Sequence, residues 1–184
     1  MLGTLSISVF CSFVCLFCFL FLFLQQWEWT YGRIPDKAIV LMNSGWGSRW
    51  PDPRKVFNTD DPTDRTTFSF PSIQTKAAEF LVTRRHVIAI GVDSPAVEEP
   101  GTSTFPIHQL LAKNDALAVE FLANVQYLPP SGALVVIGML KLRNGTGPPA
   151  RVIGLVDDSG LLLPQPVEEE GWLEPLPSSV GGFR

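Results

Sequence analysis

The sequence predicts an α/β fold: a mixed sheet with flanking helices, preceded by an apolar N-terminal helix. Short apolar runs rich in β-branched residues are typical of buried strands, and one helix-period segment leads directly into such a run. The 15 Gly and 16 Pro among 184 residues favour a loop-rich body over a helical bundle. With 46% apolar residues the chain can bury a core, and its length corresponds to one domain.

The charge balance narrows the classes of function. The chain has 14 Lys and Arg against 18 Asp and Glu, which gives a formal net charge of −4. Proteins that bind duplex nucleic acid need a basic face to neutralise phosphates. We therefore expect no nucleic-acid partner.

The first 24 residues differ in composition from the rest of the chain. No charged residue precedes Glu28, and Leu5–Leu24 is a nearly continuous apolar segment of 20 residues, which as a helix would be about 30 Å long and cross a bilayer core. Three interpretations stay open: a transmembrane or signal-anchor helix over residues 5–24, a cleaved signal peptide, and an aberrant or alternative N-terminus. Against a cleaved signal peptide, the segment has neither a basic n-region nor a small-residue cleavage site. An anchor would place the chain at a membrane or in the secretory pathway; otherwise we expect it in the cytoplasm.

The cysteines all lie in this apolar segment. Cys11, Cys15 and Cys18 follow a spacing of i, i+4 and i+7, which places them on one face of a helix. No histidine or acid accompanies them, so we interpret them as small apolar packing residues rather than a metal site. Asn144 begins a glycosylation sequon, which would matter only in a lumenal domain and which we interpret as part of a turn.

The body begins with a strand and a long loop. Residues 38–42 (AIVLM) predict a buried strand. Residues 49–71 carry four prolines and predict an irregular excursion, a type of loop that is often functional. Apolar residues recurring at i, i+4, i+7 and i+8 predict a helix over Ser72–Arg84. Residues 86–92 (HVIAIGV) then predict a strand buried on both faces.

The second part of the body predicts a short helix and two further strands. Pro106 suits the first turn of a helix that runs to Leu111. Residues 133–142 and 151–156 predict strands, and the segment after them lacks any periodicity. The resulting domain organisation is a hydrophobic segment at 1–26, a body at 27–157 and a loose tail at 158–184.

The histidines limit the search for a chemical site. His86 opens a predicted strand and is interpreted as structural or surface-exposed. His108 follows the loop that leaves a buried strand, and ligands gather at the carboxyl ends of strands in α/β folds. Glu120 is a lone carboxylate in an apolar run, and its burial would be costly without a cation or donor. Three alternatives would avoid the cost of burying Glu120: a metal ion shared with His108, an arginine such as Arg151, or a solvent-facing position of the carboxylate.

Four stretches of the body carry a family resemblance. They are WTYGRIPDKAIVLMNSGWGSRW at 29–50, VIAIGVDSP at 87–95, TFPIHQLLAKNDALAVEFLANVQYL at 104–128 and KLRNGTGPPARV at 141–152. In this order along the chain, they resemble the C-terminal part of the metal-dependent cyclase family, which includes bacterial-type kynurenine formamidase and isatin hydrolase. The resemblance covers about residues 27–157.

The resemblance implies both a fold and a site. It implies a swivelling β/β/α-type domain that forms homo-oligomers, with zinc or manganese as cofactor and a small amide as substrate. His108 and Glu120 match family positions that bind the metal, and Trp46 and Asp93 are the candidates for the substrate pocket. The leading hypothesis is an arylformamidase of the kynurenine formamidase type, acting on N-formylkynurenine or a similar aryl or cyclic amide in tryptophan catabolism.

The chain departs from the family in its first half. The family motif H-x-G-T-H-x-D is absent, no histidine precedes His86, and no catalytic acid/base residue can be identified. One histidine and one glutamate are too few ligands to hold a catalytic metal ion tightly. We therefore expect a truncated, inactive member of the family. The alternative hypothesis is a non-catalytic, membrane-anchored or partner-binding remnant.

Overall fold

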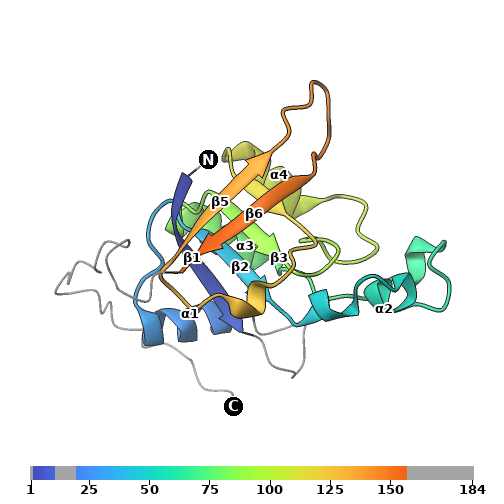
Figure 1. Cartoon of the computed structure of the whole chain (residues 1–184), viewed down its shortest axis with the longest axis horizontal. Coiled ribbons are helices and arrows are strands. Elements are labelled where there is room, and N and C mark those ends of the chain that lie inside the picture. Colours follow the sequence, from blue (N-terminus) through green and yellow to red (C-terminus); the bar gives the residue numbers. More distant parts are fainter. Residues whose placement is uncertain (1, 11–19, 157–184) are drawn as a thin grey trace, which may run out of the picture.

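The computed structural model describes residues 2–10 and 20–156. Within this described part, six strands form one mixed sheet in the order β4-β3-β2-β1-β5-β6 (Figure 1). The strands are β1 (Leu2–Phe10), β2 (Ile39–Asn43), β3 (Ala89–Val92), β4 (Leu117–Val119), β5 (Ala133–Met139) and β6 (Ala150–Leu155).

The sheet has a parallel half and an antiparallel hairpin. Strands β1, β2, β3 and β4 pair in parallel with their neighbours. Strand β5 runs antiparallel to β1, and β6 runs antiparallel to β5. The carboxyl ends of the four parallel strands therefore lie at the same edge of the sheet.

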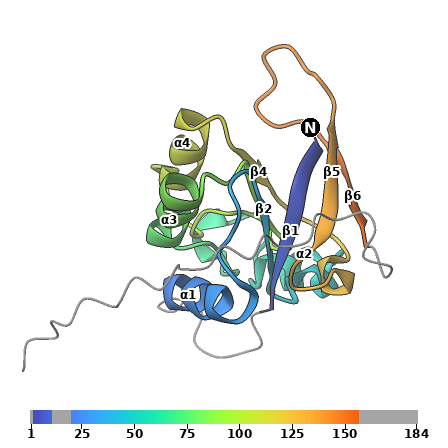
Figure 2. The ribbon, with the colours of Figure 1, turned by 90° about the vertical axis from the view of Figure 1, so that its left-hand side faces the viewer.

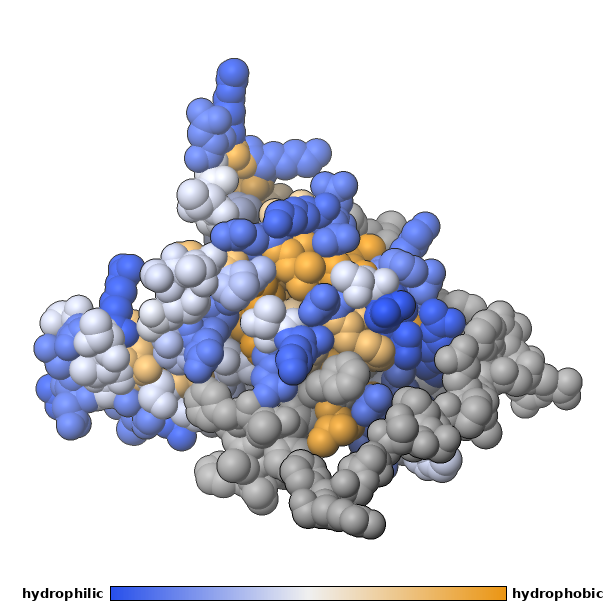
Figure 3. All heavy atoms as spheres, turned by 180° about the vertical axis from the view of Figure 1, so that it is seen from behind, coloured by the Kyte–Doolittle hydropathy of each residue, from blue (hydrophilic) through white to orange (hydrophobic). Residues whose placement is uncertain are grey.

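Three helices cover one face of the sheet (Figure 2). Residues of α3 and α4 pack with β2 and β3 in one apolar cluster, and α1 adds Leu24 and Trp27 to it. Figure 3 views the molecule from this side and shows hydrophobic surface surrounded by hydrophilic residues. A short further helix lies in the long excursion. The helices are α1 (Leu20–Tyr31), α2 (Pro53–Phe57), α3 (Thr75–Arg85) and α4 (Pro106–Lys113).

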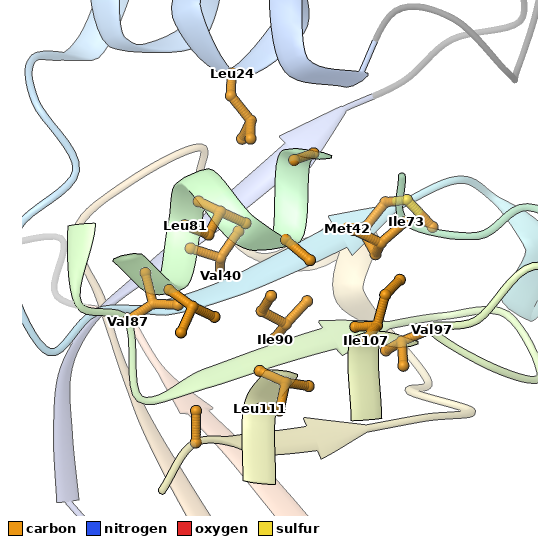
Figure 4. Packing of buried hydrophobic residues seen from close by; sticks show 14 of the residues in the cluster. Leu24, Val40, Met42, Ile73, Leu81, Val87, Ile90, Val97, Ile107 and Leu111 are labelled. Atoms are coloured by element: carbon orange, nitrogen blue, oxygen red, sulfur yellow. The ribbon is translucent and has the colours of Figure 1, made fainter. Parts of the chain in front are cut away.

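Strand β2 divides the core into two layers. Every residue of β2 is buried, and its side chains alternate between the faces of the sheet. Val40 and Met42 face the helices, where Ile90 and Leu81 pack against the same cluster (Figure 4). Residues of β2, β3 and β5 contact the loop after β4 on the other face. This second cluster comprises Ile39, Leu41, Ala89, Leu122, Val125, Val135 and Ile137.

An ion pair joins α1 to α3. The Nε and Nη2 atoms of Arg85 donate to the Glu28 carboxylate at 2.5 and 2.8 Å, and both side chains are mostly buried. The backbone N–H of Ile34 donates to the same carboxylate at 2.9 Å. These contacts hold the end of α1 against α3 and against the segment that leads into β2.

The prediction of an apolar N-terminal helix over residues 5–24 is wrong. The backbone of residues 2–10 forms strand β1 between β2 and β5, and α1 starts only at Leu20. Ser6 and Ser8 alternate with apolar neighbours, a period of two that predicts a strand and that the overall hydropathy concealed. Among the residues described, no helix is both long and apolar enough to span a bilayer. Cys11, Cys15 and Cys18 lie outside the described residues, as does the predicted loose tail.

The predicted mixed α/β architecture of the body is confirmed. The strands predicted at 38–42, 86–92, 133–142 and 151–156 correspond to β2, β3, β5 and β6. The predicted helices correspond to α3 and α4, which end one and two residues later than expected, but α3 begins at Thr75 rather than at Ser72. Strand β4 was not included in the predicted sheet, because its three residues are too short for a periodic pattern.

Candidate functional site

Three parallel strands end at one edge of the sheet, and each is followed by a polar residue. Ser44 follows β2, Asp93 follows β3 and Glu120 follows β4. Binding sites of α/β folds form at this edge, because the loops that leave parallel strands meet there. Two groups of side chains are built on these strand ends.

Asp93 organises the first group. Its Oδ1 atom accepts hydrogen bonds from the backbone N–H of Ser44 at 3.0 Å and from the Ser44 hydroxyl at 2.6 Å. Its Oδ2 atom accepts a longer hydrogen bond from the Gly47 N–H at 3.4 Å. Asp93 is only 6% exposed, so its carboxylate acts as the fixed anchor for the loop after β2.

The anchored loop presents Trp46. Gly45 adopts a left-handed conformation with φ of 75°, after which residues 46–49 form a 3₁₀ turn. The Trp46 indole N–H donates to the backbone oxygen of Val56 at 2.7 Å. The Arg49 guanidinium lies 3.6 Å from the centroid of the Trp46 ring. The indole is therefore held at its N–H edge and on one face, which restrains its ring plane.

A cavity of about 550 Å³ opens beside this loop. Trp50 and Phe121 pack edge to face with ring centroids 6.0 Å apart, and they are 68% and 47% exposed. Asp93 is the only ionisable residue among the described residues that line it. The lining residues are Trp46, Gly47, Trp50, Val56, Asp93, Pro95, Phe121, Leu122 and Ala123.

The predicted pocket residues Trp46 and Asp93 thus both line one cavity, whereas Trp50 and Phe121 were missed. Phe121 has only a weak signal in the sequence, because it directly follows Glu120 in the motif-bearing stretch. Trp50 belongs to an excursion without periodicity. Its position depends on the tertiary packing of that loop.

His108 and Glu120 form the second group. The His108 Nε2 atom lies 3.5 Å from the Glu120 Oε1 atom, as close as the family resemblance implied. Two ligands of one tetrahedral ion, with bonds of about 2.1 Å, would lie about 3.4 Å apart. The spacing of the pair therefore suits two neighbouring ligands, although their role as ligands stays a prediction.

Glu98 completes this group and was missed from the sequence. It is 3% exposed, and its Oε1 atom accepts from the His108 backbone N–H at 2.8 Å and lies 3.1 Å from His108 Nδ1. Glu98 precedes His108 by ten residues, so neither helix nor strand periodicity relates the two residues. Only the fold of the intervening loop brings them together.

The two groups adjoin without sharing one cavity. The resemblance implies a metal site at His108 and Glu120 and a substrate pocket at Trp46 and Asp93, but neither His108 nor Glu120 lines the cavity described above. The reason is that the chain turns after Glu120: the Phe121 N–H donates to the Ser94 oxygen at 3.0 Å, and Phe121 rather than Glu120 reaches the cavity.

A backbone donor, rather than Arg151, compensates the charge of Glu120. The Val97 N–H donates to its Oε1 atom at 3.0 Å, and His108 lies on the same oxygen. Arg151, suggested from the sequence, lies on β6, at the far edge of the sheet from β4. His86 is a surface residue, 3.3 Å from the Asp36 carboxylate, as its interpretation from the sequence implied.

The described residues do not complete a metal site. Within residues 2–10 and 20–156 there is no group of three or more His, Cys, Asp or Glu that could hold a metal ion. Glu98 is not a third ligand beside Glu120, because it faces the opposite nitrogen of the His108 ring. Catalytic zinc sites have three protein ligands, so the His108–Glu120 pair supplies only part of one.

Comparisons with known proteins agree with this fold. The model of the Cyclase family matches residues 22–99. Isatin hydrolase from Roseibium aggregatum is 30% identical over 140 residues, which are 72% of this chain and 50% of that protein.

Two solved structures extend the match. Isatin hydrolase A from Ralstonia solanacearum aligns with a TM-score of 0.66 and 28% identity, over 83% of this chain and 53% of its own. Isatin hydrolase A from Labrenzia aggregata, bound to benzyl benzoate, aligns with a TM-score of 0.69 and 26% identity, over 82% and 60%. The chain thus spans half to three fifths of the length of these relatives. It is a cyclase-family, isatin hydrolase-like protein that covers part of their length.

Proposed function

We propose that this chain forms the substrate pocket and part of the metal site of a hydrolase that acts on aryl cyclic amides of the isatin type. The cavity between Trp46, Trp50 and Phe121 carries the proposal. Its volume of about 550 Å³ lies within the range of small-molecule sites. Aromatic side chains on its walls suit a flat aromatic ligand, because offset and edge-to-face contacts between rings are favourable.

The charges around the cavity support a neutral ligand. The one carboxylate on the wall, Asp93, is occupied by the donors of Ser44 and Gly47. No lysine, arginine or histidine belongs to the cavity's described lining. N-formylkynurenine carries an amino-acid carboxylate that would find no cation there, whereas isatin is uncharged. The kynurenine formamidase type therefore becomes the alternative, and the named relatives support the isatin type.

Hydrolysis is a separate step from binding. In metal-dependent hydrolases, the ion lowers the pKa of bound water and generates hydroxide. His108 and Glu120 would be two of its ligands, with zinc or manganese as the metal that the family implies. Because the described residues supply no third ligand of that ion, we expect this chain by itself to bind the substrate without turning it over.

Calorimetric titration of the full chain with isatin and with N-formylkynurenine tests the proposed substrate class. Isatin is expected to bind saturably and more tightly. Phe121→Ala should weaken isatin binding about tenfold, because it removes one aromatic wall. The matched control is Tyr127→Ala, an aromatic residue that is 76% exposed and does not line the cavity. Equal effects of both variants, or tighter binding of N-formylkynurenine, would contradict the proposal.

Turnover is measured in the same samples by the loss of isatin absorbance after adding Zn²⁺ or Mn²⁺. No rate above the metal-only background is expected. Metal-dependent turnover that is lost in Glu120→Gln would show that the chain's own donors suffice, and would overturn the claim of an incomplete site.

The non-catalytic alternative rests on that same incomplete donor set. A partner-binding remnant has no need of a preserved ligand pocket. It predicts no saturable binding of either compound, so the titration distinguishes the two hypotheses.

A further inference from the structure

The geometry points to Glu98 as a positioning residue that holds the proton of the neutral His108 ring on Nδ1 and leaves the Nε2 lone pair facing Glu120. This inference goes beyond the proposed function. It concerns the tautomer of one side chain and applies whether or not the chain turns over a substrate.

The position of Glu98 is fixed by the start of α4. Its Oε1 atom accepts from the His108 backbone N–H at 2.8 Å, on the third residue of the helix. Phe105, at the N-cap, makes no side-chain capping bond, so Glu98 caps this turn from a remote segment. A carboxylate is also favoured near the positive end of the helix. Glu98 is 3% exposed and is therefore held in place by its surroundings.

The same oxygen determines where the imidazole proton lies. Glu98 Oε1 is 3.1 Å from His108 Nδ1 and within hydrogen-bond geometry. A carboxylate only accepts hydrogen bonds, so Nδ1 must carry the hydrogen of this bond. Charge-assisted bonds of this kind are stronger than those between neutral groups. In a neutral ring the proton on Nδ1 leaves Nε2 as an acceptor.

The contact on the other side of the ring is different. His108 Nε2 lies 3.5 Å from Glu120 Oε1, beyond the usual 2.7–3.2 Å of an N–H···O bond. That oxygen already accepts from the Val97 N–H at 3.0 Å. Two acceptors therefore face each other, an arrangement that suits a cation or a transferable proton between them. Glu98 creates this arrangement from behind the ring, in the way that outer carboxylates orient ligating histidines.

Nitrogen-15 NMR of the histidine rings reads the tautomer directly, because protonated and unprotonated ring nitrogens have well-separated shifts. The full chain without added metal is measured at a pH where both histidines are neutral. The chain has only 2 histidines, and His86→Asn assigns the signals. We expect the Nδ1–H form to predominate at His108. An imidazole in water favours the Nε2–H form, so a predominance of that form at His108 would overturn the inference without any variant.

Matched substitutions of the two flanking carboxylates identify the residue responsible. Glu98→Leu should lower the ratio of the Nδ1–H to the Nε2–H form about tenfold, since a hydrogen bond to a charged group is lost. Glu120→Leu should leave the Nδ1–H form predominant. Reversed effects of the two substitutions would overturn the assignment. Glu98→Leu also removes the cap of α4, so the amide spectrum of this variant checks that it folds. If it does not fold, Glu98→Gln replaces it and should keep a smaller excess of the Nδ1–H form. An unchanged ratio of the two tautomers in Glu98→Gln would contradict the role of the carboxylate.

Discussion

The parallel half of the sheet and the β5–β6 hairpin contain similar apolar residues but differ in burial. All residues of β2 and β3 are buried, whereas β6 is exposed except at Val152, which is half-buried. The candidate site residues Ser44, Asp93 and Glu120 all follow strands of the parallel half. The difference shows that β2 and β3, which are covered on both faces, provide the rigid support for the site, next to the half-buried β4.

The hairpin has a different part in the fold. Its residues Val135 and Ile137 cover one layer of the core, but Ile153 and Leu155 on β6 are 47% and 44% exposed. No residue of β5 or β6 lines the cavity. We therefore expect changes in β2 and β3 to affect both stability and the site, and changes in the exposed strand β6 to affect neither strongly.

The largest expected effect comes from truncating isoleucine in the two regions. Ile90→Ala on β3 should lower the free energy of unfolding by about 2–5 kcal/mol, because Ile90 is 0% exposed and its removal leaves a cavity under the helices. Ile153→Ala on β6 should cost less than about 1 kcal/mol. Urea unfolding followed by circular dichroism measures both. Equal losses would contradict the division of the sheet into a supporting and a peripheral half.

The next effect concerns the anchor at the end of β3. Asp93→Ala leaves the N–H and hydroxyl of Ser44 without their acceptor and should cost about 1–3 kcal/mol. It should also abolish isatin binding, because the loop that carries Trp46 loses its fixed position. Asp60→Ala, in an exposed position of the excursion, is the control and should change neither quantity. Retained isatin binding in Asp93→Ala would show that the loop does not depend on this carboxylate.

Two strand glycines test the same comparison at a smaller scale. A Cβ atom on Gly91 of β3 would lie 2.5 Å from Leu41 Cδ2 and 2.6 Å from Leu122 Cδ1, so two buried leucines would have to move. Gly91→Ala should therefore cost about 1–3 kcal/mol. A Cβ atom on Gly138 of β5 would meet only the Arg151 oxygen at 3.6 Å, an ordinary contact. Thermal unfolding should show Gly138→Ala within about 0.5 kcal/mol of the parent chain.

The parts of this fold that the sequence predicted are those with a local pattern. The buried run at 38–42 and the helix beginning near Ser72 carry periodicity that directly reflects their burial. Strand β1 was missed, because its alternation is embedded in an apolar segment that also suits a helix. Strand β4 was missed because its three residues are too short for a periodic pattern.

The candidate site was only partly predictable for a similar reason. His108, Glu120, Trp46 and Asp93 stand in motifs, so their family resemblance identified them as candidates. Glu98 belongs to no motif, and its contact with His108 is created by the loop that leads into α4. The compensation of Glu120 by the Val97 N–H could not be predicted either, since a backbone donor leaves no signal in the sequence.

The smallest effect is expected outside both halves of the sheet, in the excursion over residues 49–71, and sets the baseline for the comparison. The Thr63 hydroxyl and N–H both donate to Asp61 Oδ1, at 2.6 and 2.9 Å. These bonds hold the pKa of the Asp61 carboxyl below its usual value, and the bond from the hydroxyl contributes most. A carboxyl whose pKa is lower in the folded than in the unfolded chain stabilises the fold above its unfolded pKa, and this stabilisation is lost as the pH falls through the folded pKa.

Thr63→Val should raise the pKa of Asp61 toward the ordinary value, whereas Thr63→Ser should keep it low, as read from carbon-13 titration of the carboxyl group. Thr66→Val changes the neighbouring turn, where the hydroxyl donates to Asp64, and should leave the pKa of Asp61 in place. Because Asp61 is fully exposed, none of these substitutions should change the midpoint of urea unfolding measurably at neutral pH. A shift as large as that of Gly91→Ala would show that the excursion supports the fold as strongly as the parallel strands do.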